Sequence, residues 1–278
     1  AYLTKFVFYF ALSAMLFRFS SDLSLSELYD PEFIYAYLSA SLIIYFLATA
    51  VAIFRKKVPS EAAVEAQCSV IGNVGFLGIP MLAILMGPKS VGFIMIILAI
   101  DLIVFGSLIV LIIVASKDKK LDIFLFYRVL LGLMKNPMIV SIICGLLWSA
   151  SGWSIPGPIN DFIVMLGSAA TPGALFAIGA SLAQKSTERF EVAAWLSFCK
   201  LVLHPFAVCI AVFYIFEVEL YAATVMIAAS SLPVAGNIFM VAQHYNVAPK
   251  RASAAIFLST VLSIFTVSFT IAWVSSLN

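Results

Sequence analysis

The 278-residue chain contains 63% hydrophobic residues, only 11% charged residues and a net charge of +2. Because soluble domains carry about 25% charged residues, this composition excludes a soluble globular protein and indicates an integral membrane protein. The apolar runs are about 20 residues long, which fits membrane-spanning helices and excludes the ~10-residue alternating strands of an outer-membrane barrel. The small net charge gives no reason to expect a nucleic-acid partner.

Nine membrane-spanning helices are predicted from the apolar runs and from the polar, turn-forming linkers between them. In chain order they cover about 3–19, 34–54, 62–86, 90–115, 136–153, 158–183, 192–216, 219–245 and 251–274. The linkers are short, so no soluble domain fits between the helices. Residues 1–278 are therefore expected to form a single membrane domain embedded in the lipid bilayer.

The basic residues of the linkers predict the orientation of the chain. Alternate linkers hold twelve of them, namely Arg55, Lys56, Lys57, Lys117, Lys119, Lys120, Arg128, Lys135, Lys185, Arg189, Lys250 and Arg251. The opposite linkers hold Arg18 and Lys89 beside several acidic residues. Basic loops stay on the cytoplasmic side of a membrane. The sequence thus predicts a multi-pass protein of the cell (inner) membrane with its C-terminus outside.

The two halves of the chain are weakly similar to each other. The run from Ala36 aligns without gaps with the run from Ala194, and residues 13–23 align with residues 172–182. The third and eighth spans share a Gly-Asn pair. Because the matching spans are offset by five, an odd number, the copies must lie in opposite orientations, as in many secondary transporters. The fifth span then lacks a partner, which predicts a tenth helix before Ala1. Repeat 1 would cover 1–116 without its first helix, and repeat 2 would cover 130–278.

Helix breakers interrupt the third and eighth spans at corresponding places. The third reads "IGNVGFLGIP" from residue 71, and the eighth reads "SSLPVAGN" from residue 230. Paired interruptions are the best sequence indication of a transporter's central site, where half-helix N-termini can receive an anion. The alternative is close helix packing around small residues. The candidate substrate-binding residues from these segments are Asn73, Gly75, Pro80, Pro233 and Asn237.

Three ionisable residues lie inside predicted spans, where such groups are costly and usually functional. Lys200 could supply positive charge to an anionic substrate, or act with Asp101 in a proton-coupled switch. Two structural alternatives for Lys200 remain: an ion pair with Asp101, or a side chain that extends to the cytoplasmic interface. Asp101 is expected to be functional. His204 lies one turn from Lys200 and is expected to be a hydrogen-bonded core histidine.

No enzyme signature is present in the sequence. HExxH, CxxC, Walker and GxSxG motifs are all absent, and two histidines are too few for most metal chemistry. We therefore expect no catalytic residue, no metal site and no cofactor, while sodium or proton coupling stays open.

Four motifs together resemble the auxin efflux carrier family, which includes bacterial malonate transporter-like members. They are "GNVGFLGIPM" (72–81), "TPGALFAIGASL" (171–182), "KLVLHP" (200–205) and "SLPVAGNIFMVAQHYN" (231–246). The likeness covers nearly the whole chain and begins at the family's second helix. One departure is Ser13, where the family usually has proline.

The resemblance implies an all-α fold of inverted five-helix repeats with two crossing broken helices, similar to bile-acid symporters and sodium/proton antiporters. It implies a scaffold part at about 1–20 and 136–183 and a transport part at about 34–115 and 192–274. It also implies elevator-like motion, a homodimer and small organic anions as substrates. Asn73, Pro80, Pro233 and Asn237 would lie at the helix crossing.

The expected function is secondary transport of small organic carboxylate anions. One alternative is a sodium-coupled organic-anion symporter. The other, from a different class, is a membrane sensor that binds a small anion without transporting it; the lack of a soluble signalling domain favours a carrier.

Overall fold

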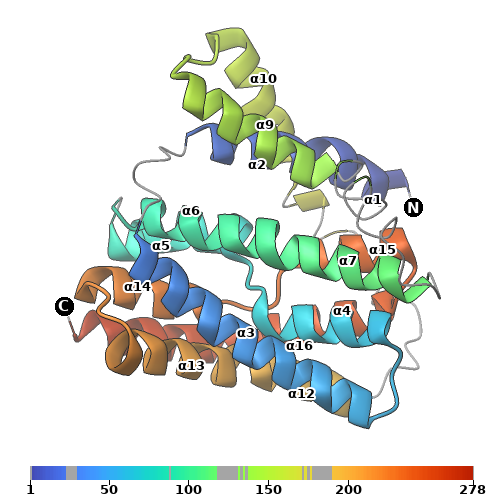
Figure 1. The fold of residues 1–278 in the computed structure, drawn as a ribbon. Helices are drawn as coiled ribbons and strands as arrows, with labels where there is room; N and C mark the ends of the chain where they lie inside the picture. Colours follow the sequence, from blue (N-terminus) through green and yellow to red (C-terminus); the bar gives the residue numbers. More distant parts are fainter. Residues whose placement is uncertain are drawn as a thin grey trace.

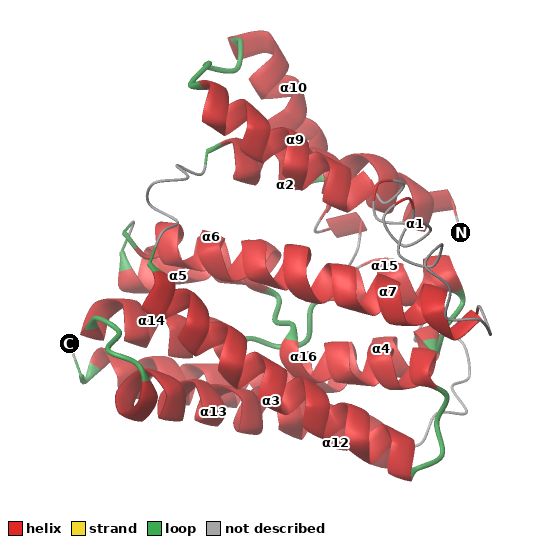
Figure 2. Cartoon of the chain, viewed as in Figure 1, coloured by secondary structure: helices red, strands yellow, loops and turns green. Residues whose placement is uncertain are grey.

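The computed structural model describes residues 2–22, 30–87, 89–117, 137–170 and 190–277, with residues 131, 134, 172, 173 and 176. Over these residues the chain is helical, and the described part has no β-structure apart from one isolated bridge (Figure 2). The expected all-helical class is confirmed for these residues. Much of the predicted sixth span, beyond Ser168, lies outside them.

The helices and π-helical turns (η) follow one another in chain order. The first half contains α1 (Tyr2–Phe6), η1 (Val7–Ala11), α2 (Leu12–Ser21), α3 (Pro31–Phe54), α4 (Pro59–Val70), η2 (Val74–Gly78), α5 (Ile79–Met86), α6 (Ser90–Ile100), η3 (Asp101–Phe105) and α7 (Gly106–Lys117). The second half contains α9 (Pro137–Ser151), α10 (Gly157–Ser168), α12 (Phe190–Phe198), η4 (Cys199–Leu203), α13 (His204–Ile210), η5 (Ala211–Ile215), α14 (Leu220–Ser230), α15 (Gly236–Tyr245) and α16 (Pro249–Ser275).

Four helical segments are long and apolar enough to cross a membrane. They are Pro31–Phe54, Ser90–Ser116, Phe190–Ile215 and Pro249–Ser275. Large apolar side chains such as Phe206, Phe265 and Phe269 point outward from them and are more than half exposed, as contact with lipid requires. The structure thus supports a multi-pass membrane protein, whereas the total of nine spans and the inverted repeat stay predictions.

Proline and short polar residues set where several helices begin. α3, α4, α9 and α16 each begin at a proline, whose missing N–H is not needed in the first turn. Before α3, the Asp30 carboxylate accepts a hydrogen bond from the Phe33 N–H at 3.1 Å, which satisfies one free donor of that turn. These local signals explain why the predicted boundaries lie within a few residues of the observed ones.

The helices lie in two groups (Figure 1). Helices α1, α2, α9 and α10 lie together on one side, and α2 contacts both α9 and α10. The other described helices form a larger group. Gly145 of α9 allows a close approach to α2, because an added Cβ would lie 2.6 Å from the Phe17 carbonyl oxygen.

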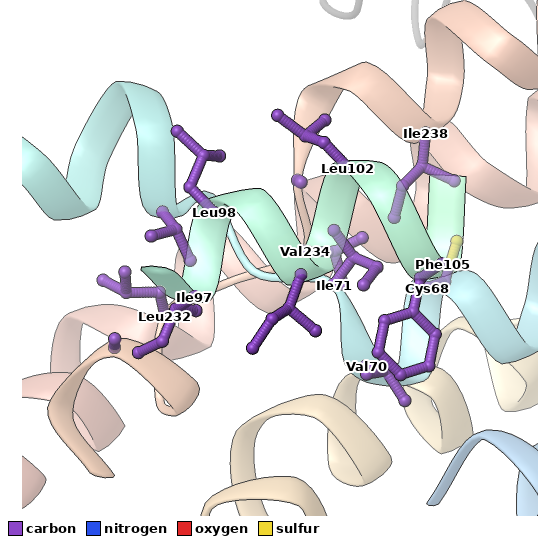
Figure 3. Packing of buried hydrophobic residues seen from close by; sticks show 14 of the residues in the cluster. Cys68, Val70, Ile71, Ile97, Leu98, Leu102, Phe105, Leu232, Val234 and Ile238 are labelled. Carbon is purple, nitrogen blue, oxygen red and sulfur yellow. The ribbon is translucent and has the colours of Figure 1, made fainter. Parts of the chain in front are cut away.

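The larger group has a dense apolar core around its centre. Residues 222–230 of α14 are all buried, and four of them are alanines that let neighbouring helices approach closely. Figure 3 shows Ile71, Leu98, Leu232, Val234 and their neighbours packed around the two non-helical segments that interrupt α4–α5 and α14–α15. The interruptions therefore lie inside the protein core and are shielded from lipid.

A buried ion cluster joins three helices at the end of the larger group where α3 ends and α16 begins. The Glu65 side chain is fully buried and pairs with Arg55, next to the end of α3, and with Arg251 of α16, at 2.8 Å for the latter. Arg251 also lies 3.3 Å from Glu61. Breaking a buried pair of this kind costs about 3–5 kcal/mol, so the cluster holds α3, α4 and α16 together.

Gly145→Ala should destabilise the protein, because the new methyl group collides with backbone of α2. Overpacking of this kind costs about 1–3 kcal/mol, and we expect a lower melting midpoint in detergent. Gly92→Ala on α6 is the control, since nothing lies within 4 Å of its added Cβ. Identical melting of both variants and the wild type would contradict this packing.

Candidate functional site

Two interrupted helices meet in the core of the larger group. Residues 71–73 separate α4 from η2, and residues 231–235 separate α14 from α15. The two segments, which we call the central break, pair in antiparallel fashion at Gly72 and Val234. The Asn73 N–H donates to the Pro233 carbonyl at 2.8 Å, and the Ala235 N–H donates to the Ile71 carbonyl at 3.0 Å. Part of the backbone groups freed by the breaks is thereby satisfied without water.

A serine from α16 completes this pairing. The Val234 N–H donates to Ser259 Oγ at 3.1 Å, while the same hydroxyl donates to the Ile256 carbonyl of its own helix. The hydroxyl replaces a partner that Val234 would have had within an unbroken helix. α16 is thus attached to the central break by a buried side-chain contact.

Gly72 and Pro233 explain the position of the break. Pro233 has no N–H to continue α14. A Cβ on Gly72 would lie 3.3 Å from Lys200 Cε and 3.5 Å from the Ala229 carbonyl oxygen, so glycine allows the close approach. Pro80, expected at the helix crossing, lies in the first turn of α5, beyond the intervening η2. Its part in the site stays a prediction.

Asn73 and Asn237 lie where the second half-helices begin. Asn73 precedes η2, and its carbonyl accepts from the Leu77 N–H at 3.1 Å; Asn237 is the second residue of α15. In the described part of the chain, Oδ1 of each asparagine is buried without a hydrogen-bond partner. Helix N-termini carry partial positive charge. Two positive helix ends therefore meet at one place, and each lies beside an asparagine whose amide oxygen can still accept a hydrogen bond.

Lys200 lies on the opposite side of the central break, at a helix C-terminus. Its side chain is fully buried in η4, and its ammonium group donates to the Ser230 carbonyl at the end of α14. This position excludes a lysine that extends to the interface. Carbonyls at a helix C-terminus carry partial negative charge, which the ammonium group neutralises. Gly75, another candidate, lies outside this contact, in η2 beside Leu98 and Met15.

Asp101 and His204 are buried and hydrogen-bonded. Asp101, the first residue of η3, accepts from the Tyr37 hydroxyl at 2.8 Å and makes no direct ion pair with Lys200 among the described contacts. His204 Nε2 lies 3.0 Å from Ser41 Oγ, and its Nδ1 lies 3.3 Å from Lys200 Nζ. The expected hydrogen-bonded histidine agrees with this geometry. Sequence reasoning missed Tyr37 and Ser41, although their spacing of four residues within an apolar span was a signal.

A pocket of about 350 Å³ lies between the two helix groups. It is lined by Met15, Arg18 and Phe19 of α2, by Gly75, Phe76 and Ile79 of the η2–α5 segment, and by Ile163, Val164, Gly167 and Ser168 of α10. The pocket thus reaches the half-helix that follows Asn73. Pockets of roughly 300–1,000 Å³ are typical of small-molecule sites.

Arg18 is the charged residue of the pocket lining. It forms an ion pair with Asp22, one turn further along α2, and its side chain is 28% exposed. Sequence reasoning placed Arg18 on the outer side without a role. The signal was present, because a basic residue stands alone at the end of an apolar span on the acidic side.

Ser259→Ala should destabilise the central break, because the Val234 N–H loses its acceptor inside the core. An unpaired buried donor costs about 1–3 kcal/mol, which should lower the melting midpoint in detergent. Ser263→Ala, one turn along α16, is the matched control, since the Ser263 hydroxyl donates to the Thr260 carbonyl within its own helix. Equal melting of the two variants would argue against the role of Ser259.

Comparison with known proteins shows the family of this chain. A family model described as membrane transport protein matches residues 1–271. A protein of Rhizobium meliloti (strain 1021) with the name "Putative malonate transporter" is 27% identical over 270 residues, which are 96% of this chain and 84% of the relative. The family match confirms the resemblance drawn from the four motifs. The chain belongs to the auxin efflux carrier family of membrane transport proteins.

Proposed function

We propose that this membrane transporter is a secondary carrier of small organic carboxylate anions that works by elevator-type alternating access. The observation that carries the proposal is the central break, where the N-termini of two half-helices meet inside an apolar core. Helix N-termini can bind an anion through their backbone N–H groups, without a charged side chain in direct contact with the anion.

The bound carboxylate lies at the N-termini of η2 and α15 in this proposal. The amides of Asn73 and Asn237 supply N–H donors, while Gly75 and Pro233 keep the backbone open for close approach. Lys200 adds positive charge from the other side of the break. The name of the Rhizobium meliloti relative suggests a dicarboxylate. A second carboxylate would then point into the pocket, towards Arg18.

The two helix groups supply the moving parts. We assign α1, α2, α9 and α10, within about 1–20 and 136–183, to the scaffold, and the segments at about 34–115 and 192–274 to the transport part. The pocket lies between the two groups, so sliding one against the other would change the side to which the site opens. The proposal also includes inverted repeats at 1–116 and 130–278 and a homodimer. The protein would lie in the inner membrane with its C-terminus outside.

Transport should not require sodium. In carriers with broken helices, half-helix C-terminal ends and unwound carbonyls hold the coupling cation. Here the Lys200 ammonium group already contacts the C-terminal carbonyl of α14. Replacing sodium by choline should therefore leave malonate exchange unchanged within about two-fold, a factor worth about 0.4 kcal/mol. A fall of about ten-fold or more would favour the sodium-coupled symporter.

Counterflow in proteoliposomes tests the carrier directly. A panel of radiolabelled malonate, succinate, acetate and indole-3-acetate should include at least one acid that exchanges. Asn73→Ala and Asn237→Ala should each reduce exchange by about 10–100-fold, because a hydrogen bond to a charged group contributes about 1.5–3 kcal/mol.

Asn160→Ala is the control for these variants, because Asn160 lies on α10 and is not among the residues that line the pocket. Unchanged exchange in both central variants would contradict the proposed site. Binding of an acid without any counterflow would instead support the non-transporting sensor.

A further inference from the structure

A row of buried polar side chains connects the central break to Asp101. Lys200 Nζ lies 3.3 Å from His204 Nδ1, and His204 Nε2 lies 3.0 Å from Ser41 Oγ. Ser41 interacts with the hydroxyl of Tyr37, one turn away on α3. The Tyr37 hydroxyl donates to Asp101 Oδ1 at 2.8 Å. The row therefore joins an ammonium group to a carboxylate through three uncharged side chains.

These five side chains lie deep in the larger helix group. Four elements contribute to the row: α3, η3, η4 and α13. None of its members is more than 2% exposed. In the described part of the chain, Asp101 Oδ2 has no hydrogen-bond partner, which leaves a free acceptor at the end of the row. Asp101 and Lys200 also both lie in wide π-helical turns, which occur frequently at functional sites.

All donors in the row can point the same way. Lys200 has donors only, so His204 Nδ1 is the acceptor and Nε2–H donates to Ser41. The Ser41 hydroxyl then donates to Tyr37, and the Tyr37 hydroxyl donates to Asp101. One shift along the row moves a proton from each donor to its acceptor. Lys200 loses one proton, Asp101 gains one, and the three intermediate groups each give and receive one.

Other titratable groups lie on the elements around the row. Tyr221 donates to the Met86 carbonyl, and Glu65 pairs with Arg55 and Arg251 at the end of α4. The surrounding elements carry, besides these, Tyr45 on α3, Cys68 and Glu61 on α4, Cys199 on η4 and Cys209 on α13, with Tyr35, Glu32 and Glu191 exposed near helix ends. Among the described residues of these elements, the charges that lie in the middle of the core are those of Lys200 and Asp101.

We propose that this row is a proton relay that makes the carrier an anion–proton symporter. The inference rests on the proposed carrier function and identifies its coupling ion. In the empty carrier, an ammonium group at Lys200 and a carboxylate at Asp101 sum to zero charge. An added carboxylate at the central break leaves one uncompensated negative charge in the core, which is costly.

One extra proton restores neutrality. The relay passes a proton from Lys200 to Asp101, and Lys200 takes another from water that reaches the central break with the anion. The loaded carrier then holds the anion, an ammonium group at Lys200 and a carboxylic acid at Asp101. One proton therefore enters and leaves with each carboxylate charge placed at the break.

Proton movement can be measured with proteoliposomes that contain the pH indicator pyranine and hold the membrane potential at zero. External malonate, or the fastest-exchanging acid of the panel above, should acidify the interior of wild-type vesicles beyond the change in protein-free vesicles. Asp101→Asn mimics the protonated acid. It should abolish this acidification and the pH dependence of exchange between pH 6 and 8, while counterflow continues.

Tyr37→Phe keeps the ring and removes the relay hydroxyl, so proton-coupled net uptake should fall at least ten-fold. Tyr45→Phe is the matched control: Tyr45 lies two turns along α3, is equally buried, and its hydroxyl has no hydrogen-bond partner among the described residues. It should behave as the wild type.

The outcomes separate the two proposals. Counterflow without acidification in wild-type vesicles overturns the relay and leaves the carrier function intact. Parallel loss of counterflow and acidification in Asp101→Asn also overturns the relay, because a network that only holds the helices together would give that result. Absence of counterflow for every acid of the panel overturns both proposals.

Discussion

The backbone pairing between residues 71–73 and 233–235 is the interaction on which the rest of the structure depends. Interrupting two helices inside an apolar core frees N–H and carbonyl groups that water cannot reach. Two reciprocal hydrogen bonds and the Ser259 hydroxyl satisfy part of this set. Because the segments run antiparallel, the same contact places two helix C-termini and two helix N-termini around one point. The geometry of the candidate site is a consequence of this pairing.

Charge then divides the central break into two unlike halves. At the carbonyl side, Lys200 is fixed against Ser230 and next to Gly72, and no space for a side chain remains between them. At the amide side, Asn73 and Asn237 keep buried oxygens without partners in the described part of the chain. A built-in cation on one side and two helix N-termini on the other favour an anion as the missing component. The same lysine begins the polar row to Asp101.

Local sequence signals predicted much of the fold, and tertiary contacts account for what they missed. Prolines at helix starts and polar linkers predicted the span boundaries, and Gly72, Asn73 and Pro233 predicted the breaks. The sequence does not show how far Pro80 lies from the break, because a proline in a first helical turn looks the same in sequence as one that breaks a helix. Three contacts were missed: Lys200 with Ser230, Glu65 with two arginines, and Arg18 with the pocket. The first two join residues far apart in sequence, and the third depends on packing between helix groups. Periodicity and composition carry no information about such contacts.

A thermal-shift titration of the purified protein with small mono- and dicarboxylates tests the central claim most directly, since a ligand that binds only the folded state raises the melting midpoint. We expect a saturable rise with at least one carboxylate, equal in sodium and choline, and lost when Asn73 and Asn237 are both replaced by alanine. A rise that survives the double replacement, or no rise with any carboxylate, would contradict the assignment of the central break as an anion site.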